Sequence, residues 1–331
     1  MHVPLPTPRN FSEDTPKTKV TIGVCVRNNA SAIREAIESI AQQDFPHESM
    51  EIIFVDASED ETLLIIQECS SRIDIPVRII HTSRKGLGYA RNLVVVNATG
   101  DYILWVDGDM LLSRDYVGKL VRLMKRHSEL GIAKGQHSLK PGRNLLGTLE
   151  TYARAAGRMV DYSSEKARFK ALGTAGSIYR VDAAKQVGGF DEDITGYGED
   201  WDIEMRLRKA GWVFRTIDAT YSDHESRGLT WKNLWIRYWR RGYDTHYFLH
   251  KNVGAIKHYR MFPLAAIIAG LLHSHKLFVL TRQKIVFLLP LQSFFKMTAW
   301  YIGFVNSHLD SHEPDLARAK RNSKIGHYAL V

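Results

Sequence analysis

The sequence predicts an α/β fold in which a mainly parallel, Rossmann-like sheet carries helices on both faces. Three observations lead to this class. Runs of β-branched and aromatic residues of strand length alternate with helix-like segments from Val20 onward. Two of these runs, 51–55 and 101–106, end directly at an aspartate. Glycine or polar turn residues follow the runs, and this alternation predicts right-handed crossovers between parallel strands.

The elements are expected in a definite order. Residues 20–26 form an apolar strand, and residues 28–31 supply turn and N-cap residues for a helix through Ala41. A further helix is expected at 199–210, because acids occupy its first turn, bases occupy its last turn and Gly211 follows. Between them the chain continues with a strand at 51–55, a helix from 60 to about 73, a strand at 77–81, a helix that ends at 96, and a strand at 101–106.

Composition is that of an enzyme-sized chain. With 331 residues, of which 44% are apolar and 24% charged, the chain can bury a sizeable core. Cys25 and Cys69 are the only cysteines and lack metal-ligand spacing, so we expect no disulfide scaffold and a reducing compartment. Residues 1–19 are polar, without the apolar run of a secretory signal, and predict a flexible tail.

Positive charge is concentrated near the C-terminus. Residues 226–331 hold 16 Lys and Arg against 4 Asp and Glu, which exceeds the net +9 of the whole chain. A basic region beside apolar stretches suits an anionic membrane surface, whereas nucleic-acid binding would require stacking platforms or a reading motif. The sequence therefore favours a membrane partner and no nucleic acid. Some of these cations could also bind a diphosphate.

Acidic residues follow two of the expected strands. Asp56 ends one strand, and Asp107-Gly108-Asp109 follows another. Ligands of open α/β sheets bind beyond the carboxyl ends of the strands, so these acids should face one crevice. Two carboxylates on a tight turn suit a hard cation such as Mg²⁺ or Mn²⁺. An Asp-x-Asp turn alone is more often a solvated surface turn, and the preceding strand reverses that preference.

The glycines of Gly86-Leu87-Gly88 admit two interpretations. A dinucleotide-binding oxidoreductase would need a third glycine and a place in the first β/α unit, and both are missing. A glycine turn that starts the next helix explains the residues better, and Arg91 on that helix can still line the pocket.

Taken in order, the motifs resemble those of the family 2 glycosyltransferases, which are inverting enzymes with a GT-A nucleotide-sugar fold. The resemblance extends from Val20 to Glu225. It is carried by the nucleoside segment 55–62, the Gly-x-Ala-Arg-Asn helix at 88–92, the metal and ribose motif 107–109, the acceptor-side loop 188–192 and the catalytic Glu199-Asp200 pair.

The resemblance and the residue types together assign expected roles. Asp200 is the expected general base, since inversion needs an acceptor hydroxyl to lose its proton as it attacks the anomeric carbon. Its alternative role is to complement the helix dipole, as Glu199 would. Donor binding is expected from Val26, Asp56, Arg91, Asp107, Arg240 and Arg241, and acceptor-side contacts from Phe190, Asp191, Glu199 and Trp201.

The expected metal site consists of Asp107, Asp109 and His224, with Mn²⁺ or Mg²⁺ as the cofactor. His224 could equally be a packing or surface histidine. Arg240 and Arg241 could instead belong to a basic helix that faces a membrane.

Two departures from the family pattern limit what can be inferred about substrates. The nucleoside segment is one residue shorter than the common form and has Ala57 where Asp or Gly is usual. The family pattern therefore does not identify the nucleobase of the donor. The processive Gln-x-x-Arg-Trp motif is absent, and single sugar additions are expected.

Two apolar stretches, 262–272 and 285–305, follow the expected catalytic region. The first has 11 residues, short of the roughly 20 needed to span hydrocarbon. The second contains Lys296, and a central lysine costs roughly 2.5–3.5 kcal/mol on insertion. We therefore expect helices that lie in the membrane interface, with Trp300, Tyr301 and Phe304 as aromatic anchors. A soluble oligomerisation hairpin is the alternative.

The expected organisation is a tail at 1–19, a GT-A catalytic domain at 20–229, a basic and apolar helical membrane-associated extension at 230–310 and a polar basic tail at 311–331. The resemblance implies a nucleotide-sugar donor. Attachment to the cytoplasmic face of the membrane suggests a lipid-linked acceptor, on polyprenyl or dolichyl phosphate, or a saccharide. A sugar-1-phosphate nucleotidyltransferase and a catalytically silent membrane-bound scaffold are the competing functions.

Overall fold

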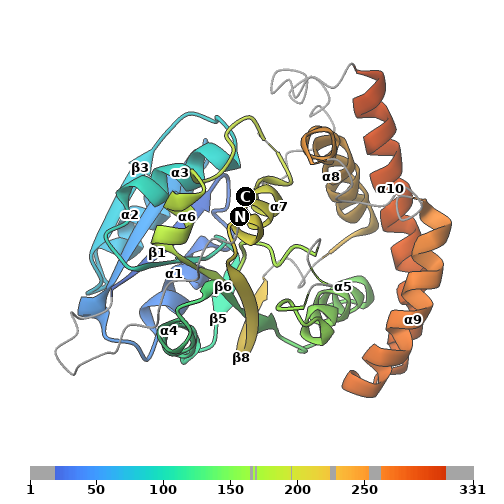
Figure 1. Cartoon of the computed structure of the whole chain (residues 1–331), viewed down its shortest axis with the longest axis horizontal. Helices are drawn as coiled ribbons and strands as arrows, with labels where there is room; N and C mark the ends of the chain where they lie inside the picture. Colours follow the sequence, from blue (N-terminus) through green and yellow to red (C-terminus); the bar gives the residue numbers. More distant parts are fainter. Residues whose placement is uncertain are drawn as a thin grey trace.

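An eight-stranded sheet separates two layers of helices, and a group of C-terminal helices lies beside this α/β part (Figure 1). The computed structural model describes residues 19–164, 167, 170–194, 196–223, 229–252 and 262–310. The strands are β1 Val20–Val26, β2 Met50–Asp56, β3 Val77–His81, β4 Tyr102–Trp105, β5 Met110–Leu112, β6 Leu130–His137, β7 Ser177–Arg180 and β8 Val213–Asp223.

Strand order in the sheet is β3-β2-β1-β4-β7-β6-β8-β5. The first four strands are parallel, as the sequence predicts. Strand β7 runs antiparallel to both neighbours, β6 and β8 are parallel, and β5 pairs with β8 in the antiparallel direction. The sheet is therefore mainly parallel, with the reversed strands confined to its second half.

The helices are α1 Ile33–Ala41, α2 Thr62–Ser70, α3 Leu87–Asn97, α4 Tyr116–Arg126, α5 Leu145–Ala155, α6 Val181–Gln186, α7 Glu199–Lys209, α8 Trp231–Lys251, α9 Pro263–Thr281 and α10 Leu289–Leu309. Short 3-10 helices lie at His47–Ser49, Ala156–Met159 and Lys284–Leu288. The elements expected from the sequence between residues 20 and 106, and the helix at 199, are confirmed within a few residues.

Each face of the sheet has its own core. Alternate residues of β1 point to opposite faces, so Val24 joins the cluster under α1, α2 and α4, while Cys25 joins the cluster under α3, α6 and α7. Both cysteines are free and buried, as expected. Because both faces are covered, the carboxyl edge of the sheet is where polar residues of the strands can meet a ligand.

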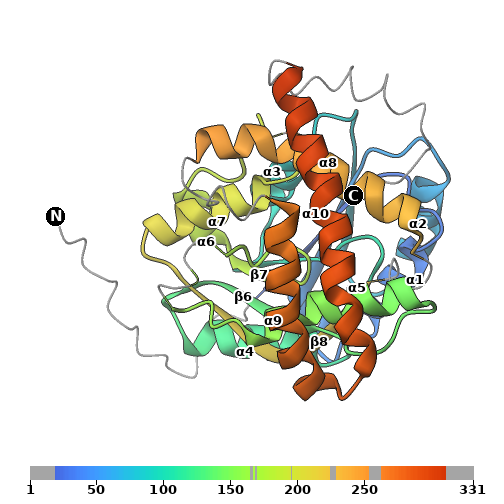
Figure 2. The same cartoon turned by 90° about the vertical axis from the view of Figure 1, so that its right-hand side faces the viewer.

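The C-terminal helices pack closely on one another. Helix α10 runs along α8 and α9, and Figure 2 shows α9 and α10 side by side across one face. The closest approach lies at two glycines. A methyl group on Gly242 would lie 1.8 Å from the carbonyl oxygen of Trp300, and one on Gly303 would lie 1.9 Å from that of Trp239. Neither helix can accept a side chain there without moving apart.

We expect Gly303→Ala to lower the free energy of unfolding by about 1–3 kcal/mol, the usual cost of overpacking against a rigid backbone. Urea unfolding followed by tryptophan fluorescence measures this loss. Gly157→Ala is the matched control, because a methyl group there would meet only the Tyr162 hydroxyl, at 3.7 Å. Equal midpoints for the two variants would show that α8 and α10 are not packed as described.

Lys296 connects α10 to α5 instead of facing lipid or water. Its Nζ lies 2.8 Å from Oε2 of Glu150 on α5, and both side chains are buried. Glu150 also lies 3.7 Å from Arg154, which pairs with Asp223 at the end of β8. Burial alone would raise the pKa of Glu150, yet Lys296 and Arg154 hold it well below its usual value. The charge of Lys296, which argued against insertion of this stretch into a membrane, is thus compensated inside the protein by Glu150.

The aromatic anchors expected on α10 are partly wrong. Trp300 is buried, with 8% of its surface exposed, and its ring stacks on Phe304 at 5.4 Å. Phe304 in turn packs against His246 of α8 at 4.6 Å. Trp300 and Phe304 thus lie near the close contact of α8 with α10 at Gly242 and Gly303, instead of at an outer surface. Tyr301 is half-buried and packs near Phe262 at 5.7 Å.

Aliphatic side chains cover the outside of the helical hairpin. The apolar stretch expected to stop at 272 continues as helix to Thr281, so α9 has 19 residues. By length and composition, α9 and the segment Lys284–Leu309 could each cross a membrane. The large exposed apolar residues here are Phe262, Leu264, Ile268, Leu271, Leu272, Val279, Leu280, Phe287, Leu288, Leu291, Ile302 and Leu309. So many large exposed apolar side chains on one helical hairpin indicate a surface that contacts a partner.

Candidate active site

Asp56 lies at the carboxyl end of β2, between the ends of β1 and β3. It is opposite Val26 on one side and His81 on the other. The Asp56 side chain is fully buried, and its Oδ2 lies 2.8 Å from Nδ1 of His81. Its Oδ1 is also buried and has no hydrogen-bond partner within the described part of the chain. A buried carboxylate oxygen without a donor is costly unless a ligand supplies one.

Asp107 and Asp109 flank a glycine on the turn between β4 and β5. Both are half-buried, and the Met110 amide donates to the Asp107 carbonyl at 3.0 Å. A methyl group on Gly108 would lie 2.7 Å from side-chain atoms of both Val26 and Asn29. Glycine is therefore needed for the turn to pack against the end of β1. The two aspartates thus lie at the same sheet edge as Asp56.

The expected third metal ligand cannot be placed. Strand β5 pairs with β8 so that Met110 is opposite Asp223, one residue before His224. His224 itself lies outside the described residues. Among the residues that are described, no group of three His, Cys, Asp or Glu side chains is arranged to hold a metal ion. The Asp-Gly-Asp turn nevertheless offers two hard oxygen donors of the kind that Mg²⁺ and Mn²⁺ prefer.

Helix α3 connects this edge to the catalytic helix. Arg91 is buried and forms an ion pair with Glu199 on the first turn of α7. Asp107 and Asp200 both act on Arg91 electrostatically, so the turn, α3 and α7 converge on its guanidinium. Arg91 thus has a protein carboxylate as its partner, and its expected role in donor binding stays a prediction.

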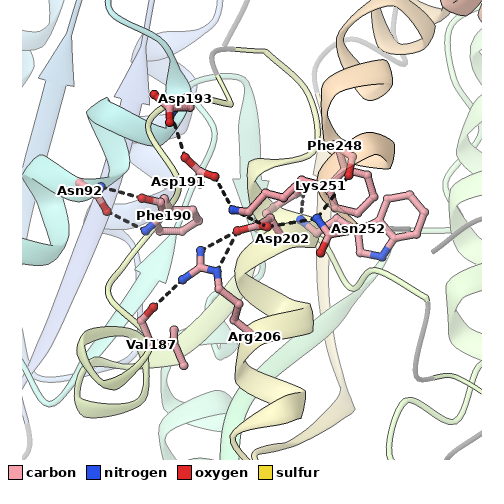
Figure 3. Close-up of polar contacts among 12 residues, drawn as sticks. Asn92, Val187, Phe190, Asp191, Asp193, Asp202, Arg206, Phe248, Lys251 and Asn252 are labelled. Carbon is pink, nitrogen blue, oxygen red and sulfur yellow. Dashed lines mark hydrogen bonds and ion pairs between the residues drawn. The ribbon is translucent and has the colours of Figure 1, made fainter. Parts of the chain in front are cut away.

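The acceptor-side loop is fixed to α3 by Asn92. The Asn92 side chain donates to the Phe190 carbonyl at 2.9 Å and accepts from the Phe190 amide at 2.8 Å (Figure 3). The Phe190 ring is buried and packs edge-on against Trp105 at 5.5 Å. Phe190 therefore holds the loop to the core through its ring. Of the two acids that follow, Asp191 exposes 18% of its side-chain surface and Glu192 is exposed.

Asp200 follows Glu199 on the first turn of α7. It is half-buried, and a methyl group on Gly173 would lie 3.5 Å from its Oδ2. Trp201, the neighbouring residue, turns away, because its ring stacks on Phe248 of α8 at 4.6 Å. The structure thus brings Asp107, Arg91, Glu199 and Asp200 within electrostatic reach of one another and places Trp201 in the contact with α8.

Comparisons with known families agree with this arrangement. A family model described as glycosyl transferase family 2 matches residues 21–178, and one described as glycosyl transferase family group 2 matches residues 102–307. The second match covers more than half of the chain. The chain belongs to glycosyltransferase family 2.

Individual glycosyltransferases are more distant. TarS of Staphylococcus aureus, a poly(ribitol-phosphate) β-N-acetylglucosaminyltransferase, is 33% identical over 102 residues, which is 30% of this chain but 17% of TarS. The glycosyltransferase YfnE of Bacillus subtilis is 24% identical, over 65% of this chain and 67% of its own. Mannosyltransferase PcManGT of Pyrobaculum calidifontis, solved with GDP-Man and Mn²⁺, has a TM-score of 0.62 at 19% identity and covers 92% of this chain and 90% of its own. That likeness shows the GT-A fold.

This glycosyltransferase also gathers three arginines: Arg240, which the sequence predicts to bind the donor, and Arg27 and Arg84, which no sequence motif indicated. Arg27 follows β1, Arg84 follows β3 and Arg240 lies on α8. Burial lowers the pKa of Arg84, and the positive charges of Arg27 and Arg240 lower it further. Asp244 and Glu59 are the acids within reach of Arg84. Arg241, by contrast, stacks over the rings of Tyr197 and Tyr238, each at 5.1 Å. Like charges gathered in this way favour an anion.

Lys134 and Glu204 both bind the backbone of residues 172 and 173, and no sequence motif indicated either residue. Glu204 is buried and accepts from the backbone amides of Leu172 and Gly173, both at 2.7 Å. Lys134 donates to the carbonyls of the same two residues, at 2.6 and 3.2 Å. Burial and the neighbouring Asp200 raise the pKa of Glu204 to about 8. Glu204 and Lys134 therefore fix Gly173, which lies beside the expected base Asp200. In the sequence, Glu204 is 31 residues and Lys134 is 39 residues from Gly173.

Glu199 should make turnover sensitive to pH near neutrality. Burial raises its pKa to about 7, and the negative charge of Asp200 adds to this rise, against the opposing effect of Arg91. A raised pKa means that the ion pair with Arg91 is lost as the pH falls through about 7, instead of about 4.5. We expect kcat to fall along an acid limb near pH 7.

The acid limb should be absent in Glu199→Gln, because the glutamine side chain does not titrate. The plateau value of kcat in this variant should be lower than in wild type. Initial rates measured from pH 5 to 9 with saturating donor give both profiles. The same acid limb in the two proteins would assign the titration to another group.

Proposed function

We propose that this protein is an inverting glycosyltransferase that moves one sugar from a nucleotide-diphosphate sugar to an acceptor hydroxyl or phosphate with the help of a divalent metal. The observation that carries the proposal is the convergence of Asp56, Asp107, Asp109 and the α7 acids at one edge of a GT-A sheet. Family membership supports a transferase over a sugar-1-phosphate nucleotidyltransferase.

The nucleoside would lie against Asp56. Its buried Oδ1 can accept a hydrogen bond from an N–H of the base, while His81 already bonds the other oxygen. The diphosphate would extend toward the arginine cluster, where Arg27, Arg84 and Arg240 could donate charge-assisted hydrogen bonds. This placement explains why Arg27, Arg84 and Arg240 lie within electrostatic reach of one another.

The Asp107-Gly108-Asp109 turn would hold the metal ion, Mn²⁺ or Mg²⁺. Its carboxylates provide the oxygen ligands, with Asp107 able to contact the ribose instead, and His224 is the proposed third ligand. Metal use is supported by PcManGT, whose structure contains Mn²⁺ with GDP-Man. When bound, such an ion neutralises the charge that develops on the leaving diphosphate.

Asp200 is the proposed base. It lies on the first turn of α7, where acidic side chains complement the helix dipole. Lys134 and Glu204 fix Gly173 beside it, so the acceptor hydroxyl would meet a base whose surroundings are held on both sides. Attack from the face opposite the diphosphate then inverts the anomeric centre, as the acceptor proton passes to Asp200.

The acceptor is proposed to be carried by a lipid at the cytoplasmic face of the membrane. Exposed leucines of α9 and the tip of the hairpin form the apolar surface, with Lys276, Arg282 and Lys284 beside them. Apolar side chains next to cations suit the interface of an anionic leaflet. A polyprenyl or dolichyl phosphate, or a saccharide linked to one, fits this location.

A donor screen tests the proposal. Isothermal titration with UDP-, GDP- and dTDP-sugars, each with and without Mn²⁺, should give one preferred base whose affinity requires the metal. Asp56→Asn should weaken that affinity by at least about tenfold, since a base N–H would lose its charged acceptor. Donor hydrolysis in the same samples separates an enzyme from a silent scaffold. Metal-independent binding, or none, would overturn the proposed site.

A further inference from the structure

Lys251, the last residue of α8, is shared between two carboxylates on different elements. Its Nζ lies 2.9 Å from Oδ1 of Asp202 on α7 and forms an ion pair with Asp191 of the acceptor-side loop. Figure 3 shows the lysine between the two aspartates. One side chain of the C-terminal extension therefore contacts both the catalytic helix and the loop that faces the acceptor.

Asp202 is the fixed point of this contact. Its side chain is 1% exposed and two residues from the expected base. Arg206, one turn later on α7, donates to its Oδ2 at 2.8 Å, and the Asn252 amide donates to its Oδ1 at 3.2 Å. A buried carboxylate needs such compensation, and Asp202 has it without Lys251. Loss of the lysine should therefore not leave a buried charge unpaired.

Side chains of α7, α3 and α8 hold the acceptor-side loop and the residue before it. Arg206 donates to the Val187 carbonyl at 2.6 Å, and Asn92 holds Phe190 from α3. Both contacts come from the catalytic region. Lys251 holds the next residue, Asp191, from the C-terminal helices. The position of the Asp191 carboxylate thus depends on where α8 ends.

Helix α8 contacts the following segment as well. The Tyr197 amide donates to Oδ2 of Asp244 at 3.3 Å, and Gly198 packs against Phe248. Gly198 immediately precedes the Glu199-Asp200 pair. The second half of α8 therefore lies along the acceptor side of the site, with Lys251 at its end.

We propose that Lys251 is a positioning residue for the acceptor: it transmits the seating of α8, α9 and α10 to the acceptor-side loop through Asp191. The inference rests on the proposed function, because it assigns the loop to acceptor binding. It adds that the C-terminal helices, besides providing an apolar surface, set the geometry of the acceptor site.

Magnitudes separate this role from simple stabilisation. The Lys251 side chain is 37% exposed and Asp191 is 18% exposed, and ion pairs of this kind contribute about 0–1 kcal/mol to folding. Small displacements of a substrate-facing loop, however, can change rates by one to two orders of magnitude. Removal of the lysine should thus affect the acceptor far more than the stability of the fold.

The test uses Lys251→Met, which keeps the length of the side chain and removes its charge. Lys251→Arg is the conservative rescue, and Lys232→Met removes the same charge from the exposed first turn of α8. Hydrogen exchange of peptides covering 187–198 is measured first, without substrate. We expect faster exchange in Lys251→Met, wild-type exchange in Lys232→Met and partial restoration in Lys251→Arg.

Kinetics then use the preferred nucleotide sugar with farnesyl phosphate as the acceptor probe, and with water for donor hydrolysis. Lys251→Met should raise the acceptor KM on the order of tenfold while donor KM and hydrolysis change less than about twofold. Asp191→Asn should have no further effect in the Lys251→Met background, because both substitutions remove the same ion pair between Lys251 and Asp191.

The outcomes distinguish this inference from the proposed function. Unchanged exchange in 187–198 together with an unchanged acceptor KM would overturn the role of Lys251. Equal losses in donor and acceptor parameters would do the same, because they would indicate a general structural role. If wild type transfers no sugar to the probe but Lys251→Met still loosens the loop, the contact stands and the lipid-phosphate acceptor is wrong.

Discussion

Asp200→Asn is expected to lower kcat by about 10²–10⁴-fold, the usual contribution of a positioned general base. The amide is nearly the same size as the carboxylate but cannot take the acceptor proton. Donor affinity should change little, because the proposed nucleotide contacts lie at Asp56 and the arginine cluster, on elements other than α7. Turnover by product formation and donor affinity by titration give the two numbers from one preparation.

Asp182→Asn is the matched control for this substitution. Asp182 lies on the first turn of α6 and is exposed, so it shares the helix-dipole environment without facing the site. We expect wild-type kcat from the control. An Asp200→Asn enzyme that keeps more than about a tenth of wild-type turnover would remove Asp200 from the role of base.

Glu150→Gln is expected to lower the free energy of unfolding by about 3–5 kcal/mol. The substitution leaves Lys296 buried on α10 without its carboxylate, and Arg154 loses one of two acidic partners. The helical layer should loosen first, since Lys296 is its contact with α5. Urea unfolding followed by tryptophan fluorescence measures the loss.

A second variant shows whether the cost comes from the unpaired charge. Glu150→Leu combined with Lys296→Met replaces both buried charges with apolar groups, and such replacements are often neutral or stabilising. The double variant should therefore recover most of the stability that Glu150→Gln loses. A double variant as unstable as the single one would show that the ion pair is not what joins α10 to the catalytic region.

The half of the fold that the sequence predicts is the half with local signals. Strands β1 to β4 are short apolar runs that end at polar residues, and their parallel order follows from the helices between them. Strand β7 is different, because its direction depends on pairing with β4 and β6, which lie far away in sequence. No periodicity encodes that choice.

Lys296 illustrates a second limit. In an apolar stretch its charge argues against membrane insertion, yet its partner Glu150 lies 146 residues earlier. Trp300 similarly has the composition of an interfacial anchor and is buried by the contact of Gly242 with α10. Burial of these residues is decided by helix packing, which a single sequence does not specify.

The candidate site divides in the same way. Asp56, Asp107 and Asp109 are visible in the sequence because each follows a strand, and Asp200 because it opens a helix. Arg84 cannot be predicted in this way, because it belongs to no motif. It becomes a candidate anion-binding residue only when the fold brings it close to Arg27 and Arg240. Lys134, Glu204 and Lys251 are also missed, because each acts on a segment distant in sequence.

A crystal structure of the protein with its preferred nucleotide sugar and Mn²⁺ tests the central claim most directly. The account predicts the base against Asp56, the diphosphate among the arginines, the metal on the 107–109 turn and the Asp200 carboxylate on the face of the sugar opposite the diphosphate. A nucleotide bound away from the ends of β1, β2 and β4, or an Asp200 remote from the anomeric carbon, would contradict it.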